Sequence, residues 1–276
     1  MPELPEVEHV TNALCGVVLG RTIEKASLIR QRLAPDIKPA SFAKKLAGAT
    51  IASVARRGKH ILLEMDNSST LIVHLRMSGR FHLLGTDDED PKFSHAIFYF
   101  SDGERLVFQD QRHFGLMKIV KTKELHETKE LSKLAPEPFS DEFSVEYLAG
   151  VLKRSNRVIK EFLLDQTKIC GVGNIYASET LFLSGITPRK RAKNIRGKSI
   201  QKLHENIRVI LHEAIELTKT IVPDPVIIGE GVYGAGSLMR WRVYDREGKE
   251  CPECSSPIKR IRQGARSTYY CAKCQR

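Results

Sequence analysis

Met1-Pro-Glu-Leu-Pro-Glu-Val-Glu8 opens the chain, and the interpretation of the remaining sequence depends on this octapeptide. A small second residue normally lets the initiator methionine be removed, which would leave Pro2 with a free secondary amine. An α-amino group titrates near about pH 8, well below a lysine, so part of it is an unprotonated nucleophile at neutral pH. Such an amine condenses with an aldehyde to an iminium, and Glu3 stands beside it as a proton donor.

The same residues also suit a purely structural role at the start of a helix. Proline is favoured in the first turn, and acidic residues there complement the positive end of the helix dipole. Composition alone favours this structural interpretation, and the rest of the chain reverses the preference. An amphipathic helix is predicted over residues 3–18 from apolar residues at three- to four-residue spacing. These are Leu4, Val7, Val10, Leu14 and Val17.

Composition points to a polyanionic partner. The 276 residues include 44 Lys plus Arg against 33 Asp plus Glu, for a net charge of +11. Nucleic acid is the simplest such partner. An anionic membrane surface is the competitor, but no apolar run approaches the roughly 20 residues that a spanning helix needs. With no signal peptide, we expect a cytoplasmic, nucleoid-associated protein whose six cysteines are reduced or metal-bound.

Short β-type runs follow the first helix between about residues 22 and 120. Turn signals such as Asp102-Gly103 separate them. Many short strands joined by hairpins are typical of a β-sandwich or a barrel. The predicted runs are 50–54, 60–64, 70–74, 81–84, 96–100, 105–108 and 116–120.

Helical periodicity returns beyond a charged, proline-bearing linker. Helices are predicted at 144–153, 157–166, 174–184 and 198–220. Between the second and third lies Cys170-Gly-Val-Gly-Asn174, where the amides of the next helix start can hold a phosphate. A helix C-cap followed by an N-cap explains these glycines equally well. The Gly- and Pro-rich stretch 221–240 is predicted to be a loop.

Two C-x-x-C knuckles near the end of the chain form its strongest chemical pattern. Cys251 and Cys254 are followed, after sixteen residues, by Cys271 and Cys274. This spacing predicts one tetrahedral zinc ion, which is structural because all four ligands are protein thiolates. Model zinc peptides gain roughly 10–16 kcal/mol from the metal, enough to fold so short a segment. The arm between the knuckles is basic and suits phosphates, with a solvated basic tail as the alternative.

Further motifs stand along the whole chain. They are Arg57-Gly-Lys59, His74-Leu-Arg-Met-Ser-Gly79, Asp110-Gln-Arg-His-Phe-Gly115, Leu134-Ala-Pro-Glu-Pro138, Leu163-Leu-Asp-Gln166 and Gly171-Val-Gly-Asn-Ile-Tyr-Ala-Ser-Glu179. With the octapeptide and the four cysteines, they make the chain resemble, end to end, the bacterial formamidopyrimidine-DNA glycosylase and endonuclease VIII family. The formamidopyrimidine branch is the more similar of the two.

The resemblance implies an α+β fold in three parts around a linker. An N-terminal catalytic β-sandwich with flanking helices is expected over 1–128, and the linker over 129–143. A helix-two-turn-helix DNA-binding domain with a lesion loop is expected over 144–240. A zinc-ribbon-like β-hairpin finger is expected over 241–276.

The resemblance also implies an activity, that of a bifunctional glycosylase and abasic-site lyase. The processed Pro2 amine attacks C1′ of a damaged nucleotide, and Glu3 handles protons on the sugar. The iminium then permits β- and δ-elimination. Lys59 is expected against the phosphate and sugar, and Glu6 is expected to shape the lesion pocket. A non-catalytic relative that binds lesions or abasic DNA is the alternative, although the intact catalytic residues argue against it.

Binding of damaged double-stranded DNA by a monomer is the expected context of this activity. The target base must be flipped out of the duplex, and the resemblance assigns filling of the void to Met77, Arg112 and Phe114. It assigns clamping of the flanking phosphates to Lys160, Asn174 and Arg266.

Several departures from the family pattern touch lesion recognition rather than chemistry. His113 replaces the second arginine of the usual Arg-Arg-Phe-Gly, and Gln111 stands where proline is common. Ala265 replaces a glutamine, and the 218–225 stretch lacks the usual Gly-Gly-Thr-Thr-like run. These changes predict weaker discrimination for 8-oxoguanine.

A generic zinc-ribbon module that binds nucleic acid is a third possibility for the function of the chain. It leaves the N-terminal octapeptide unexplained.

Overall fold

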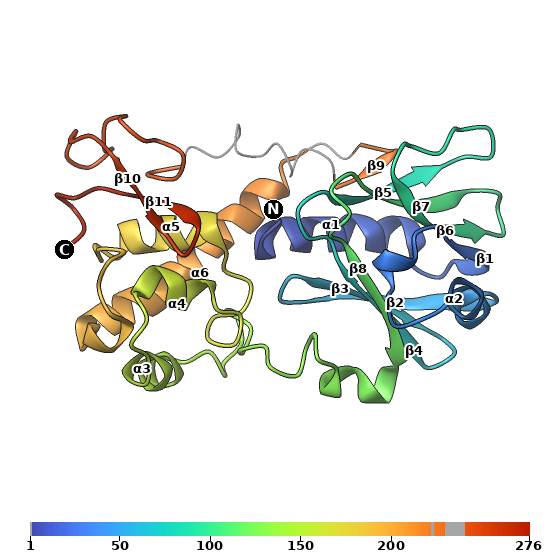
Figure 1. The fold of residues 1–276 in the computed structure, drawn as a ribbon, viewed down its shortest axis with the longest axis horizontal. Helices are drawn as coiled ribbons and strands as arrows, with labels where there is room; N and C mark the ends of the chain where they lie inside the picture. The colour runs from blue at the N-terminus through green and yellow to red at the C-terminus, as the bar shows by residue number, and fades with distance from the viewer. Residues whose placement is uncertain (1, 222–223, 230–240) are drawn as a thin grey trace. The chain divides into compact units, whose positions relative to one another are not determined.

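The computed structural model describes residues 2–221, 224–229 and 241–276, which fall into two compact units. The first unit holds residues 2–132 together with 218–221 and 224–229. The second holds 133–217 and 241–276, and Figure 1 labels the elements of both. Within the described part of the chain, no helix is both long enough and apolar enough to span a membrane.

The first unit is built mainly from antiparallel strands. Its helices are α1 (Leu4–Val18) and α2 (Pro39–Leu46), with short 3-10 turns η1 (Gln31–Leu33) and η2 (Thr122–Glu127). Its strands are β1 (Thr22–Leu28), β2 (Ala49–Arg57), β3 (His60–Met65), β4 (Ser69–His74), β5 (Gly79–Leu84), β6 (Ser94–Phe100), β7 (Arg105–Asp110), β8 (Leu116–Lys121) and β9 (Ile227–Ile228).

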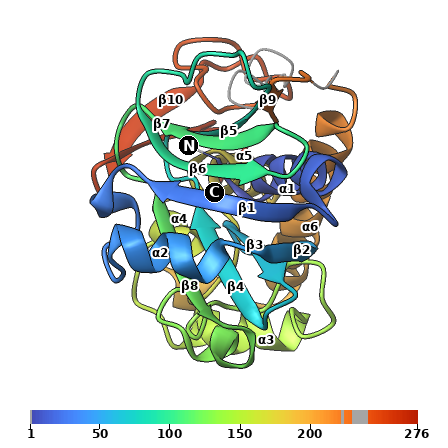
Figure 2. The same cartoon turned by 90° about the vertical axis from the view of Figure 1, so that its right-hand side faces the viewer.

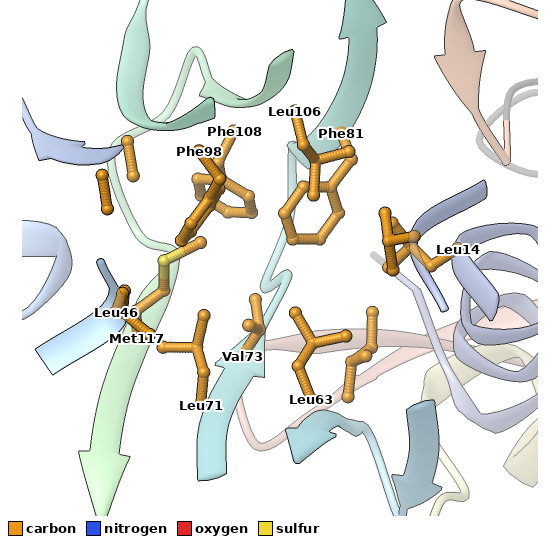
Figure 3. Close-up of a cluster of buried hydrophobic side chains, with 14 of the residues drawn as sticks. Leu14, Leu46, Leu63, Leu71, Val73, Phe81, Phe98, Leu106, Phe108 and Met117 are labelled. Carbon is orange, nitrogen blue, oxygen red and sulfur yellow. The ribbon is translucent and has the colours of Figure 1, made fainter. Parts of the chain in front are cut away.

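These strands form one folded-over sheet in the order β8-β4-β3-β2-β1-β6-β7-β5-β9. The short β1–β2 pairing joins its two layers, which Figure 2 shows above and below the core. Apolar side chains of β3 and β4 face those of β5, β6 and β7, as Leu63, Leu71, Phe81 and Phe98 do in Figure 3. The predicted β-sandwich is therefore confirmed.

Helix α1 follows the predicted amphipathic pattern. Leu4, Val7, Val10 and Leu14 are at most 1% exposed, and each fully buried side chain of this size stabilises the fold by about 1.5–3 kcal/mol. Glu3 is the N-cap residue and forms a capping box with Glu6. The structural interpretation of the octapeptide thus holds, and it fixes where the N-terminal residues lie.

The second unit combines helices with a β-hairpin. Its helices are α3 (Val145–Lys153), α4 (Ile159–Leu164), α5 (Asn174–Leu183) and α6 (Lys198–Thr218), with the 3-10 turn η3 (Ala192–Asn194). Strands β10 (Lys259–Gln263) and β11 (Arg266–Tyr270) form the hairpin. All four predicted helices are present, with no end shifted by more than two residues.

The segment after α6 differs from its prediction. The sequence assigns 221–240 to a loop of the helical domain, whereas residues 221 and 224–229 belong to the first unit. The Asp224 carboxylate accepts hydrogen bonds from the N–H groups of Val226 and Ile227, which turns the chain into β9. That strand then pairs with β5, and Ile228 enters the sandwich core. The rest of the predicted loop, 222–223 and 230–240, lies outside the described residues.

Candidate functional site

The start of α1 holds the predicted nucleophile and proton carrier. Pro2 is buried and Glu3 is 2% exposed, while Met1 lies outside the described residues. The Glu3 N–H donates to Glu6 Oε2 at 2.7 Å, so both acidic residues sit in the first turn. Pro2 and the carboxylates of Glu3 and Glu6 therefore lie together at the start of α1, at the positive end of the helix dipole.

Lys59 lies in the tight turn between β2 and β3. Arg57 pairs with His60, so Gly58 and Lys59 form a two-residue hairpin turn, and Gly58 supplies the positive φ of 59°. Arg56 ties this turn to the first helix. Its Nε donates to Glu8 Oε2 at 2.5 Å and its Nη1 to the Gly58 carbonyl oxygen at 3.0 Å.

Two buried histidines stand beside this hairpin turn. The rings of His60 and His74 meet edge-on with centroids 4.7 Å apart, and His74 Nδ1 accepts a hydrogen bond from the Arg76 N–H. Burial lowers the pKa of His60 to about 4 and that of His74 to about 2. The nearby Lys59 charge contributes to the low pKa of His74. Both imidazoles are therefore neutral at pH 7. The sequence marked His74 only as part of a motif, and the structure places it near Lys59.

The three residues assigned to void filling lie on two neighbouring connections. Met77 lies between β4 and β5, and Arg112 and Phe114 lie between β7 and β8. Met77 is 38% and Phe114 47% exposed, although both are large apolar side chains. The Arg112 guanidinium carbon is 5.5 Å from the centroid of the Phe114 ring. Arg112 and Phe114 thus form an exposed pair of a cation and an aromatic ring, and Met77 is exposed on the other connection.

In the second unit, Lys160 and Asn174 are in direct contact. Lys160 is 1% exposed, and its Nζ donates to the Asn174 carbonyl oxygen (2.8 Å), to Asn174 Oδ1 (3.0 Å) and to Ser178 Oγ (2.7 Å). These bonds use all three ammonium hydrogens. Lys160 therefore holds Asn174 in place, and its implied direct contact with phosphate stays a prediction.

The Asn174 side chain continues this chain of contacts to the hairpin. Its Nδ2 donates to the Ser267 carbonyl oxygen at 3.0 Å, next to the exposed Arg266 on β11. The three residues predicted to clamp phosphates are thus gathered at one place in this unit.

Glu179 connects α5 to the segment that leads into the hairpin. Its buried carboxylate accepts hydrogen bonds from the N–H groups of Arg242, Val243 and Tyr244 at 2.8–2.9 Å. Burial raises the pKa of Glu179 even so. The sequence marked this residue only as part of a motif, because its partners are more than sixty residues away.

The four predicted zinc ligands converge. Their Sγ atoms lie within 4.8 Å of one another, with Cys251 and Cys274 3.9 Å apart and Cys254 and Cys271 3.5 Å apart. Four thiolates about 2.3 Å from a zinc ion are about 3.8 Å apart in a tetrahedron, so this cluster fits one structural zinc.

Comparison with known proteins agrees with this arrangement. The formamidopyrimidine-DNA glycosylase N-terminal domain matches residues 1–117, and the H2TH domain of the same enzymes matches 134–225. A zinc finger found in FPG and IleRS matches 248–276.

Whole proteins match over their full length. The chain is 40% identical over 276 residues to the formamidopyrimidine-DNA glycosylase of Bacillus subtilis, covering 100% of this chain and 99% of that one. It is 41% identical over 275 residues to the enzyme of Rickettsia conorii, with the same coverage. A solved complex between the Lactococcus lactis Fpg and an abasic site containing DNA has a TM-score of 0.90 at 32% identity, covering 99% of each chain. This chain belongs to the formamidopyrimidine-DNA glycosylase family.

Proposed function

We propose that this protein is a bifunctional DNA glycosylase and abasic-site lyase of base-excision repair. It acts as a monomer on oxidised or ring-opened bases in double-stranded DNA, in the cytoplasm and in association with the nucleoid. Family membership, the net charge of +11 and the DNA complexes of related structures support this proposal. The main structural support is the pair of hydrogen bonds that Arg56 makes. They join α1, which begins beside Pro2, to the hairpin turn that contains Lys59.

Base excision begins with the Pro2 amine. Its lone pair forms a bond to C1′ of the damaged nucleotide while the bond from C1′ to the base breaks, and the base leaves with that electron pair and a proton. Loss of the amine proton and opening of the sugar ring then give an iminium. Glu3 is suited to exchange protons with the sugar ring oxygen, because it is the N-cap residue of α1 and directly follows Pro2.

Strand cleavage follows from the iminium. Its positive charge acidifies the C2′ proton, so loss of that proton expels the 3′ phosphate in β-elimination. A second elimination expels the 5′ phosphate, and hydrolysis of the imine restores the amine. Lys59 contributes a positive charge where the leaving phosphate becomes more negative.

The remaining residues bind and distort the DNA. Extrusion of the damaged base costs a few kcal/mol, and insertion of Met77, Arg112 and Phe114 into the vacated space offsets it. Arg112 contacts the orphaned partner base. Asn174 and Arg266 bind backbone phosphates, with Lys160 holding Asn174. A bound zinc ion clips the two cysteine knuckles and supplies folding free energy to the hairpin that carries Arg266.

A product assay tests this proposal. Duplex DNA with one formamidopyrimidine lesion should give strands ending in phosphate on both sides of the gap. The Pro2→Gly variant should cut far more slowly, whereas Pro5→Ala, a control at the same helix start, should keep most activity. Tight lesion binding without any product would favour the non-catalytic alternative and overturn the proposal.

A further inference from the structure

Strand register brings the two connections that carry Met77, Arg112 and Phe114 side by side. His74 at the end of β4 pairs with Leu116 at the start of β8. Gly79 at the start of β5 pairs with Asp110 at the end of β7. The connections 75–78 and 111–115 therefore leave and re-enter the sandwich at neighbouring points.

One buried carboxylate joins these two connections. Asp110 is 0% exposed, and its Oδ1 accepts a hydrogen bond from Ser78 Oγ, the residue after Met77. Its Oδ2 accepts from the Gly115 N–H at 2.6 Å. The Arg112 N–H is shared between Asp110 Oδ1 at 3.2 Å and Ser78 Oγ at 3.0 Å. The Asp110 carbonyl oxygen accepts from the His113 N–H at 3.2 Å.

Close packing beneath the carboxylate leaves these connections little room to shift. A Cβ added at Gly79 would lie 2.6 Å from the Leu75 carbonyl oxygen and 2.7 Å from the Phe108 ring. At Gly115 it would lie 2.9 Å from the same ring and 3.1 Å from Asp110 Oδ2. Each connection is thus followed or ended by a glycine that packs tightly against Phe108. Asp110 also forms hydrogen bonds beside each exposed residue: with Ser78 next to Met77, with the N–H of Arg112, and with Gly115 next to Phe114.

We propose that Asp110 and Ser78 are positioning residues that hold the two connections as one preformed wedge. The inference rests on the proposed function, in which Met77, Arg112 and Phe114 enter the duplex. An unlocked pair of loops would lose backbone and side-chain freedom on insertion, and this entropy loss would oppose base extrusion. The Ser78–Asp110 bond ensures that this ordering is complete before DNA arrives.

Two substrates separate positioning from chemistry. Excision of a formamidopyrimidine from a duplex needs base extrusion and void filling. Strand cleavage at an abasic site in single-stranded DNA needs the amine but leaves no base-pair void to fill. The test compares wild type with Ser78→Ala in single-turnover reactions on both substrates. Ser53→Ala is the matched control, since Ser53 Oγ also donates to a carboxylate, that of Glu64, at 3.3 Å.

Ser78→Ala should slow duplex excision by about tenfold, the effect of losing one hydrogen bond to a charged group. It should change single-stranded cleavage by less than about twofold, with a melting temperature like that of Ser53→Ala. In Asp110→Asn the amide nitrogen would face a donor at one of the two oxygen positions, so this variant should lower the ratio of the duplex rate to the single-stranded rate at least as far as Ser78→Ala does. 2-Aminopurine opposite an abasic site should report slower wedge insertion by Ser78→Ala.

Equal losses on both substrates, or no loss on either, would overturn the inference. Wild-type protein inactive on both substrates would instead overturn the proposed function itself, so the two failures are distinguishable.

Discussion

Arg56 donates to the Glu8 carboxylate at 2.5 Å, and the same guanidinium holds the carbonyl oxygen of Gly58. The pair joins the helix that begins beside Pro2 to the turn that carries Lys59. Pro2 and Lys59, more than fifty positions apart in the sequence, are thereby held in one part of the first unit.

Breaking this link should affect chemistry more than stability. Arg56→Gln should lower the free energy of unfolding by about 1 kcal/mol, because Glu8 is partly exposed to solvent. It should slow cleavage at abasic sites by about tenfold, because Lys59 loses its fixed position. Arg21→Gln breaks the pairing with Asp102 and Glu104 in the same unit and serves as the control. Similar rates for the two variants would contradict this role of Arg56.

Removal of zinc should unfold the hairpin while the sandwich survives. Cys251 and Cys271 pack with Val243, Ile258 and Tyr269 in a small core. We expect so small a core to need the free energy of metal binding in order to fold. Cys251→Ser should therefore reduce bound zinc well below one per chain and weaken DNA binding severely. Cys15→Ser should retain the metal. Elemental analysis gives the stoichiometry, and Cys251→Ser protein with a full zinc ion would refute the ligand assignment.

Acid should destabilise the first unit through His60 and His74. Their folded-state pKa values of about 4 and about 2 lie below the ordinary value of 6.5, so the unfolded chain takes up protons first. This contribution to stability is complete above pH 6.5 and is lost as the pH falls toward the folded values. Over that range, protonation linked to each histidine should lower the free energy of unfolding by about 1.4 kcal/mol per pH unit. Denaturant unfolding gives the free energy of unfolding at each pH. Between pH 7 and 5 this free energy should fall less steeply with falling pH in His60→Gln than in wild type. In His126→Gln, a change at an exposed site, it should fall as in wild type.

Local patterns in the sequence were enough to predict several parts of this structure. The apolar repeat that begins at Leu4 predicts α1, and short β-type runs separated by turn residues predict seven strands. The spacing of Cys251, Cys254, Cys271 and Cys274 predicts the metal cluster. Each of these signals is local, or depends on a residue pattern with one chemical solution.

Other parts depend on long-range register and could not be predicted. Strand β9 forms because Ile227 and Ile228 pair with the edge of β5, nearly 150 residues earlier in the chain. His74 enters the site because the β3–β4 pairing sets its ring against His60. The resemblance assigns a phosphate contact to Lys160, but only the structure gives the contacts of its ammonium group with Asn174 and Ser178.

Substrate choice should reflect the apolar character of the stretch after α6. Of its described residues, Ile227 and Ile228 pair with β5, and Asp224 Oδ1 is engaged with backbone N–H groups. Isoleucine side chains carry no donors and a carboxylate only accepts, so we expect the described part of this stretch to offer few side-chain donors to a flipped purine. A site with fewer matched polar groups discriminates less. We therefore expect robust excision of formamidopyrimidines and weak discrimination for 8-oxoguanine, with Arg112 favouring cytosine as the partner base.

Single-turnover excision of 8-oxoguanine, a formamidopyrimidine and an oxidised pyrimidine, each opposite cytosine and adenine, measures this preference. Much faster cutting of 8-oxoguanine opposite cytosine than of every other pair would show that the interpretation of this stretch is wrong.

Borohydride trapping shows whether the Pro2 amine is the nucleophile, because borohydride reduces the iminium to a stable covalent bond. The protein is mixed with abasic-site DNA and borohydride, and the cross-linked peptide is identified by mass spectrometry. We expect a protein that begins at Pro2, a stable adduct on that residue, and loss of the adduct when the N-terminus is blocked. Undiminished trapping by an N-terminally blocked protein, with the adduct on Lys59 or another lysine, would contradict this role of Pro2.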